Sequence, residues 1–136
     1  GGRGTLVAYN AGFEKGVLEE LAEFMGSGAR RTRLTEATGR LWDLLAIFRQ
    51  HYLAPAFGGS NSLKNVLPVL LPGSSYEGLE VANGEEAQLA WERLVAMPES
   101  VEKRRLAAAL RAYCRQDSLA LVNIFKLLQQ AILTAS

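Results

Sequence analysis

A short apolar segment near the beginning of the chain is followed at once by a helical pattern. The segment Thr5 to Asn10 (TLVAYN) is apolar and rich in residues that favour strands. From Phe13 to Phe24, apolar residues recur at spacings of three and four, which is typical of an amphipathic helix. We expect Asn10 to cap this helix and Gly26 to end it. A buried strand that turns directly into a helix is half of a parallel α/β unit.

The middle of the chain alternates helical patterns with loops. Leu34, Ala37 and Leu41 have helical spacing, so a helix is predicted after the neighbouring glycines. Asp43 precedes the apolar segment LLAIFRQHY, where it can end a short strand, cap a helix, or do both. The segment LAPAFGGSNS has the composition of a loop, and SLKNVLPVLL predicts a short helix that Pro68 ends or kinks.

The last third of the chain is predicted to be almost entirely helical. After the loop PGSSYEGLEVANG, Asn83 can cap a helix from Gly84 to about Met97. Pro98 in a first helical turn opens a long final helix that reaches Thr134. Together these patterns predict a strongly helix-weighted α/β fold with one or two parallel strands, in a single domain over residues 1–136.

Composition narrows the class of protein but indicates no particular ligand. Of the 136 residues, 49% are hydrophobic and 21% are charged, which is typical of a soluble globular chain. The formal net charge of +1 favours no class of partner, so any claim about nucleic acid must rest on local patches. A single cysteine excludes an internal disulfide and a multi-cysteine zinc site, and a single histidine excludes paired-histidine metal motifs.

No segment of the sequence indicates a membrane span or a secretion signal. The longest apolar runs, such as NVLPVLL, are far too short to cross a bilayer, and there is no signal-peptide pattern. We therefore expect no membrane partner and a cytoplasmic location in a bacterial-type cell. The chain opens with GGRG and has no initiator methionine, so we expect it to be part of something longer.

Polar residues in two helical patterns are candidates for chemistry. Tyr113 and Asp117 are four residues apart in RAYCRQDSLALVNIF and therefore project from one helix face. They can be a structural pair, in which a half-buried tyrosine hydrogen-bonds a carboxylate, or parts of a site. Near the start of the chain, Glu14 lies in a first helical turn, where the helix macrodipole favours a carboxylate by about 0.3–1 kcal/mol. Taken alone, each feature has a structural explanation.

Taken together, the two stretches resemble the tyrosine branch of the DEDD exonucleases. YNAGFE (residues 9–14) resembles the second motif of that family, and YCRQD, about a hundred residues later, resembles the third. Asp43 in WDLL and Lys64 in SLKNVL are similar to the segment that connects these motifs. From Leu6 to about Leu128 the chain resembles more closely an uncharacterised bacterial family, domain-of-unknown-function family 2779, which is usually grouped with these nucleases.

The resemblance implies a ribonuclease-H-like (DnaQ-like exonuclease) fold and a 3′–5′ exonuclease that acts on DNA or RNA with two Mg²⁺ or Mn²⁺ ions. It implies that Asp117 ligates metal, that Glu14 ligates metal directly or through water, and that Tyr113 orients the attacking water, so that these three residues form the catalytic set. Carboxylate oxygens suit such hard cations. Two metals can flank the attacking and leaving oxygens of an in-line displacement.

The resemblance also assigns supporting roles around this set. Lys64 is a candidate phosphate contact, Asn10 would support the turn and lie near the nucleic acid, and Phe13 would pack beneath that turn. Two basic clusters, one around Arg31 and one at residues 103–105, leave two explanations open. They are solvated helix faces, or they contact a nucleic acid backbone in a salt-dependent manner.

The chain departs from the family pattern in two ways. Glu14 stands where the family usually has aspartate, and one extra methylene loosens direct ligation. The first motif of the family is Asp-x-Glu on its first strand, yet the chain has only two aspartates, Asp43 and Asp117, and neither belongs to such a motif. We therefore expect the C-terminal part of a larger exonuclease-like domain that lacks the first strands, carries half of the metal site and is inactive alone.

A second protein class and a second partner stay open at this point. The alternative to the nuclease is a non-catalytic binding or assembly module that kept the fold and lost part of the site. In the sheet of the family, the strand with LVAYN lies between two neighbours. We therefore expect a homodimer in which a second copy covers residues Leu6 to Ala8.

Overall fold

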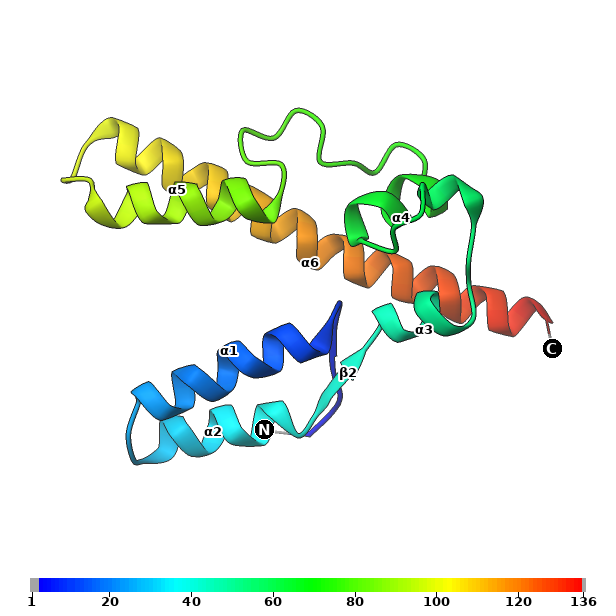
Figure 1. The fold of residues 1–136 in the computed structure, drawn as a ribbon, viewed down its shortest axis with the longest axis horizontal. Helices are drawn as coiled ribbons and strands as arrows, with labels where there is room; N and C mark the ends of the chain where they lie inside the picture. The colour runs from blue at the N-terminus through cyan, green and yellow to red at the C-terminus, as the bar shows by residue number, and fades with distance from the viewer. Residues whose placement is uncertain (1–2, 136) are drawn as a thin grey trace. The chain divides into compact units, whose positions relative to one another are not determined.

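The computed structural model of the chain describes residues 3–135 (Figure 1). The chain divides into two compact units, residues 1–62 and residues 63–136. Within the described residues there are two strands, six α-helices and one short 3-10 helix. This content confirms the predicted helix-rich α/β composition. The predicted single domain over residues 1–136 stays a prediction.

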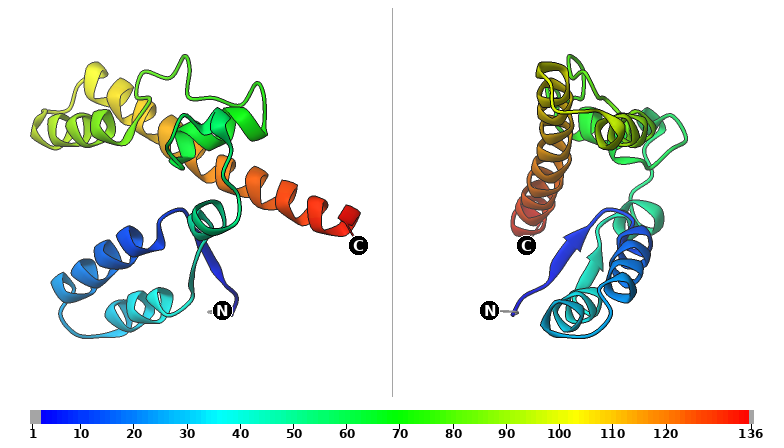
Figure 2. Two further views of the ribbon diagram at one scale, coloured as in Figure 1. Left: turned by 45° about the vertical axis from the view of Figure 1, so that its right-hand side comes forward. Right: turned by 90° about the vertical axis from the view of Figure 1, so that its left-hand side faces the viewer.

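A two-stranded parallel sheet organises the first unit. Strand β1 (Leu6–Ala8) pairs with strand β2 (Leu41–Asp43), and Leu6, Val7 and Ala8 lie opposite Leu41, Trp42 and Asp43. Helices α1 (Ala11–Phe24) and α2 (Ala29–Thr38) connect the two strands, as a parallel pair requires. Figure 2 shows the strands side by side, with α1 and α2 on the same side of them. The prediction that Leu41 continues a helix is wrong, because α2 ends at Thr38 and Leu41 pairs with β1.

The backbone of Asn10 makes the turn from β1 into α1. Its φ of 77° and ψ of 57° are left-handed, and asparagine tolerates this conformation better than most residues with a side chain. Asn10 occupies the predicted N-cap position, but its side chain makes no capping hydrogen bond. The position of the cap is therefore confirmed, and capping by the side chain is not. At the other end, Gly26 has a φ of 67° and its N–H donates to the carbonyl of Glu23 at 3.0 Å, which confirms the predicted stop.

The aromatic residues of α1 point away from the packed face of the helix. The side chain of Phe13 is 68% exposed and that of Phe24 is 85% exposed, whereas Ala22 is buried and Leu18 is half-buried. The expectation that Phe13 packs beneath the turn is therefore wrong. The physical reason is the helical repeat: the face with Leu18 and Ala22 meets the rest of the unit, and Phe13 falls on the other side.

An aromatic cluster forms the core beside the carboxyl end of the sheet. Helix α3 (Leu45–Gln50) contributes the fully buried Phe48, whose ring lies 6.0 Å from that of Tyr9 and 6.2 Å from that of Phe57. Phe57 belongs to the 3-10 helix η1 (Pro55–Phe57) in the predicted loop. The hydroxyl of Tyr9 donates to the carbonyl of Asn61 at 2.6 Å. These contacts fix the end of β1 that leads into α1.

Three helices form the second unit. The predicted short helix is α4 (Leu63–Leu70), which packs against the long helix α6 (Val101–Ala135). Pro68 does not end it, because the helix continues to Leu70. Helix α5 (Gly84–Ala96) packs along α6 around a small core of Val81, Ala90 and Leu106 (Figure 1).

The helix starts in this unit are fixed by side-chain caps. The Asn83 side chain accepts a hydrogen bond from the Glu86 N–H at 2.9 Å, which confirms the predicted cap of α5. Glu86 in turn accepts from the N–H of Ala82 at 2.8 Å, which completes a reciprocal capping pair. The prediction that Pro98 opens the last helix is wrong: α6 begins at Val101, and Ser100 Oγ accepts from the N–H of Lys103 at 3.0 Å.

Candidate functional site

The carboxylate of Asp117 is the centre of a polar cluster in the second unit. Asp117 lies in the middle of α6 and is half-buried. The hydroxyl of Tyr76 donates to Asp117 Oδ1 at 2.6 Å, a short bond of the kind that charged acceptors form. Tyr76 comes from the loop between α4 and α5 and is only 6% exposed. The buried phenol of Tyr76, which comes from the loop, therefore holds the carboxylate that projects from the side of α6.

Tyr113 joins this cluster from one helical turn before Asp117. The negative charge of Asp117 acts on its hydroxyl, and its ring lies 5.9 Å from the ring of Tyr76. The predicted shared helix face of Tyr113 and Asp117 is confirmed, because both residues lie in α6 one turn apart. The pair is in fact a trio, because Tyr76 completes it.

Burial and the negative charge of Asp117 keep both phenols protonated. Burial raises the pKa of Tyr113 most, and the negative charge of Asp117 raises it further, to about 12. Burial also has the largest effect on Tyr76, whose pKa is raised well above its usual range with help from the hydrogen bond to Asp117. Near neutral pH, both hydroxyl groups are therefore neutral hydrogen-bond donors.

The loop that carries Tyr76 is fastened to α6 at two further points. Gln116 Nε2 donates to the carbonyl of Ser75 at 3.1 Å, and Arg105 Nε lies 3.2 Å from Glu80 Oε2. A cluster built from a helix and a fastened loop is better ordered than one on a free loop, because fewer rotamers remain open to its side chains. The sequence carried no signal for Tyr76, which stands as a single aromatic residue in a loop rich in glycine and serine.

Glu14 and Asn10 lie together in the first unit, at the end of β1 where they were predicted. Glu14 is in the first turn of α1, and its Oε2 atom is out of contact with solvent. The N–H of Asn10 donates to Asp43 Oδ1 at 2.9 Å, and the N–H of Leu45 donates to the same oxygen at 3.0 Å. Asp43 thus ends β2 and also binds the start of α3, so its carboxylate is engaged with backbone.

The remaining predicted contact, Lys64, is exposed in the first turn of α4. Lys64, Tyr113 and Asp117 belong to the second unit, whereas Asn10 and Glu14 belong to the first. Within the second unit the structure places Tyr113 and Asp117 one turn apart on α6. The roles in catalysis and nucleic acid binding that the resemblance implies for these residues stay predictions.

Carboxylate oxygens of the kind that Mg²⁺ and Mn²⁺ prefer are present at Glu14 and Asp117. Among residues 3–135, however, no group of three or more histidine, cysteine, aspartate or glutamate side chains gathers closely enough to hold a metal ion. The metal-ligating roles of Glu14 and Asp117 therefore stay predictions. Over the same residues, no helix is both long enough and apolar enough to span a membrane.

Comparison with known sequences finds a family match for the first unit. Residues 1–62 match the family described as "Domain of unknown function (DUF2779)". The match has the same bounds as the first compact unit. It supports the family of unknown function that the sequence resembles, while the exonuclease part of that resemblance stays a proposal.

Curated relatives from two Mycoplasma species match most of the chain. The uncharacterized protein MG366 homolog of Mycoplasma pneumoniae is 32% identical over 131 residues, which are 88% of this chain and 20% of the relative. The uncharacterized protein MG366 of Mycoplasma genitalium is 28% identical over 139 residues, 94% of this chain and 21% of the relative. The chain therefore spans about a fifth of the length of these curated relatives. No solved structure matches the chain significantly.

Proposed function

We propose that this chain is the C-terminal part of a DEDD-type 3′–5′ exonuclease domain with a ribonuclease-H-like fold, within a longer bacterial protein of the cytoplasm. The substrate is the 3′ end of a DNA or RNA strand, and the reaction is hydrolysis of a phosphodiester bond. Mg²⁺ or Mn²⁺ is the expected cofactor of the longer protein.

The observation that carries this proposal is the position of Tyr113 one helical turn from Asp117 on one face of α6. A neutral phenol beside a carboxylate is an arrangement that suits a water-orienting group and a metal ligand. A phenol is protonated near neutral pH and can therefore hold a water molecule by hydrogen bonding. The position of Glu14, in the first turn after a strand of a parallel sheet, adds a second carboxylate of the expected kind.

Each residue has a separate task in this proposal. Asp117 and Glu14 hold part of the metal centre, and Tyr113 positions the attacking water. Bound metal supplies charge stabilisation at the phosphate and a lowered pKa of water. Two carboxylates are only part of such a centre, so the other ligands are proposed to come from elsewhere in the longer protein.

A second candidate function is a non-catalytic binding or assembly module. The observation that favours it is the state of the Asp117 carboxylate, which already accepts a hydrogen bond from the buried Tyr76. A carboxylate satisfied in this way can be a purely structural feature of a semi-buried core. The two candidates differ in one property that can be measured, the shortening of a nucleic acid strand.

The experiment that separates them uses the full-length protein and a single strand labelled at its 5′ end. The exonuclease predicts a ladder of products that shorten from the 3′ end with Mn²⁺ or Mg²⁺ and no products with a chelator. The module predicts no shortening with either metal. Reading the upstream coding sequence is a quick companion test, since the nuclease requires an apolar strand with Asp-x-Glu before Asn10.

A further inference from the structure

Four basic side chains follow one face of α6. Arg104, Arg111, Arg115 and Lys126 are all exposed, and their spacings of 7, 4 and 11 residues keep them on the same side of a helix. With a rise of about 1.5 Å per residue, the stripe is about 33 Å long. We call this set the α6 basic stripe.

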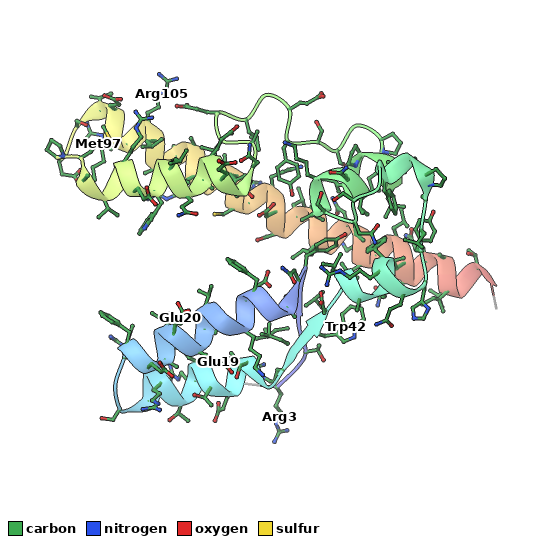
Figure 3. All side chains as sticks on the ribbon, viewed as in Figure 1. Arg3, Glu19, Glu20, Trp42, Met97 and Arg105 are labelled. Carbon is green, nitrogen blue, oxygen red and sulfur yellow. The ribbon has the colours of Figure 1, made fainter. Side chains whose placement is uncertain are left out.

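The α6 basic stripe has no neutralising partners of its own. Among residues 3–135, none of its four side chains has a carboxylate within ion-pair distance. The neighbouring cation Arg105, which Figure 3 labels near the start of α6, pairs instead with Glu80 at 3.2 Å. The acidic residues of α6 are engaged elsewhere, because Glu102 lies 3.7 Å from Arg93 and Asp117 bonds Tyr76. The positive charge along this face is therefore uncompensated.

A groove lies in the middle of the stripe. It has a volume of about 480 Å³, and Arg111 and Arg115 line it together with the amide of Gln116. Apolar side chains form the rest of the wall, including Leu79 from the loop and Leu119 from α6. No acidic residue lines the groove. Two guanidinium groups one helical turn apart can each make a bidentate contact with an anionic oxygen pair.

We propose that this groove and the α6 basic stripe bind the sugar–phosphate backbone of a single-stranded nucleic acid. The proposal rests on the proposed nuclease function, which supplies the ligand. A phosphodiester chain carries a charge on every residue and so matches a stripe of cations that runs along a whole helix. Sugars and bases pack against the apolar walls while the arginines contact the phosphates. An acidic peptide is the alternative ligand, because it also carries repeated negative charges.

The groove is separate from the cluster around Asp117. Arg115 and Asp117 are two residues apart, which places their side chains on opposite sides of α6. The groove therefore contributes affinity for the strand and takes no part in the chemistry. This separation allows the groove and the catalytic proposal to be tested independently.

The test is the salt dependence of binding, measured by fluorescence anisotropy with a labelled oligo(dT) on the full-length protein in the presence of a chelator. The double variant Arg111→Gln/Arg115→Gln should reduce the slope of log K against log salt by about 1.4, because each lost contact with a single strand contributes about 0.7. Its loss of affinity between about 50 and 200 mM salt should be about sevenfold smaller than that of the wild type. Arg111→Lys/Arg115→Lys, which keeps both charges, should retain the wild-type slope.

A matched control removes two exposed arginines outside the basic clusters, in Arg3→Gln/Arg49→Gln, and should leave the slope unchanged. The proposal is overturned if the α6 variant keeps the wild-type slope, if the control loses as much, or if poly-glutamate displaces the oligonucleotide at equal charge concentration. Circular dichroism melting of each variant confirms that the comparison is between folded proteins. The binding assay contains a chelator, so metal ligation by Asp117 does not contribute to it. A variant with Asp117 intact that loses binding therefore tests the groove alone. If the full-length protein binds the strand in a salt-dependent manner but does not cleave it, that result contradicts only the proposed nuclease function.

Discussion

The hydroxyl of Tyr76 lies 2.6 Å from Oδ1 of Asp117, a residue 41 positions later in the chain. This bond joins a loop to the middle of α6. Tyr113, one helical turn earlier, is half-buried near the same carboxylate. A carboxylate that is oriented by one buried donor suits a metal ligand, and its bond to Tyr76 equally stabilises the packing of the loop on the helix. Stability and activity therefore have to be measured together.

Tyr76→Phe should destabilise the second unit by about 1–3 kcal/mol, because it leaves the Asp117 oxygen without its buried donor. Chemical denaturation of the chain, followed by tyrosine or tryptophan fluorescence, measures this change. Tyr52→Phe is the matched control, since Tyr52 is 45% exposed and the change should stay within about 0.5 kcal/mol. Equal stability of the two variants would show that the Tyr76 bond contributes nothing.

The raised pKa of Tyr113 predicts a loss of stability at alkaline pH. Below about pH 10, the phenol is protonated in the folded and the unfolded chain, so the stability is fully present. As the pH rises from about 10 to 12, the unfolded chain loses this proton first, and the folded state is disfavoured. Tyr113→Phe should lose less stability over the same interval, measured by denaturation at several pH values. Curves that fall in parallel would contradict the assignment.

Sequence patterns predicted those elements of the chain that depend on interactions between residues close together in the sequence. The capping of α5 by Asn83 and the end of α1 at Gly26 follow from single residues and their neighbours. The parallel pairing of two short strands follows from the alternation of strand and helix. The shared face of Tyr113 and Asp117 follows from the helical repeat alone.

Features that depend on tertiary contact could not be predicted. The apolar residues of α1 form two stripes, and only packing decides that Leu18 and Ala22 turn inward while Phe13 stays exposed. Tyr76 joins Asp117 across 41 residues, a separation at which no periodicity operates. Leu41 fits a helical spacing by coincidence, and its pairing with Leu6 overrides it.

The 136-residue chain alone should bind Mn²⁺ weakly and should not shorten nucleic acid. The reason is that its described carboxylates do not gather in a group of three. Isothermal calorimetry with Mn²⁺ and an assay on a labelled single strand measure the two properties. Micromolar metal affinity together with processive trimming from the 3′ end would contradict this prediction.

The chain should also self-associate through the outer edge of β1. Leu6 and Ala8 hydrogen-bond toward β2, since the Leu6 N–H donates to Arg40 and the Ala8 carbonyl accepts from Leu44. The backbone of Val7 therefore points to the other edge, where residues 3–135 provide no strand. Light scattering at tens of micromolar, an order of magnitude typical of such contacts, should show a homodimer.

Val7→Pro tests this edge directly. It removes one N–H from the outer edge and keeps the N–H of Leu6 and the carbonyl of Ala8 that face β2. The variant should be monomeric with an unchanged circular dichroism spectrum. A wild-type chain that is monomeric at tens of micromolar, or a variant that still dimerises, would rule out the homodimer through β1.

The central claim, that Tyr113 and Asp117 belong to a nuclease site, is tested most directly by turnover per folded molecule in the full-length protein. Melting and cleavage are measured on the wild type, Asp117→Asn and Tyr113→Phe. We predict that Asp117→Asn abolishes cleavage, because an amide is a poor ligand for a hard cation. Tyr113→Phe should slow cleavage by about 10²–10³ and leave substrate binding intact, because it removes one positioning hydrogen bond. If Asp117→Asn instead lowers the melting temperature and keeps wild-type turnover per folded molecule, the two residues are a structural pair and the claim is wrong.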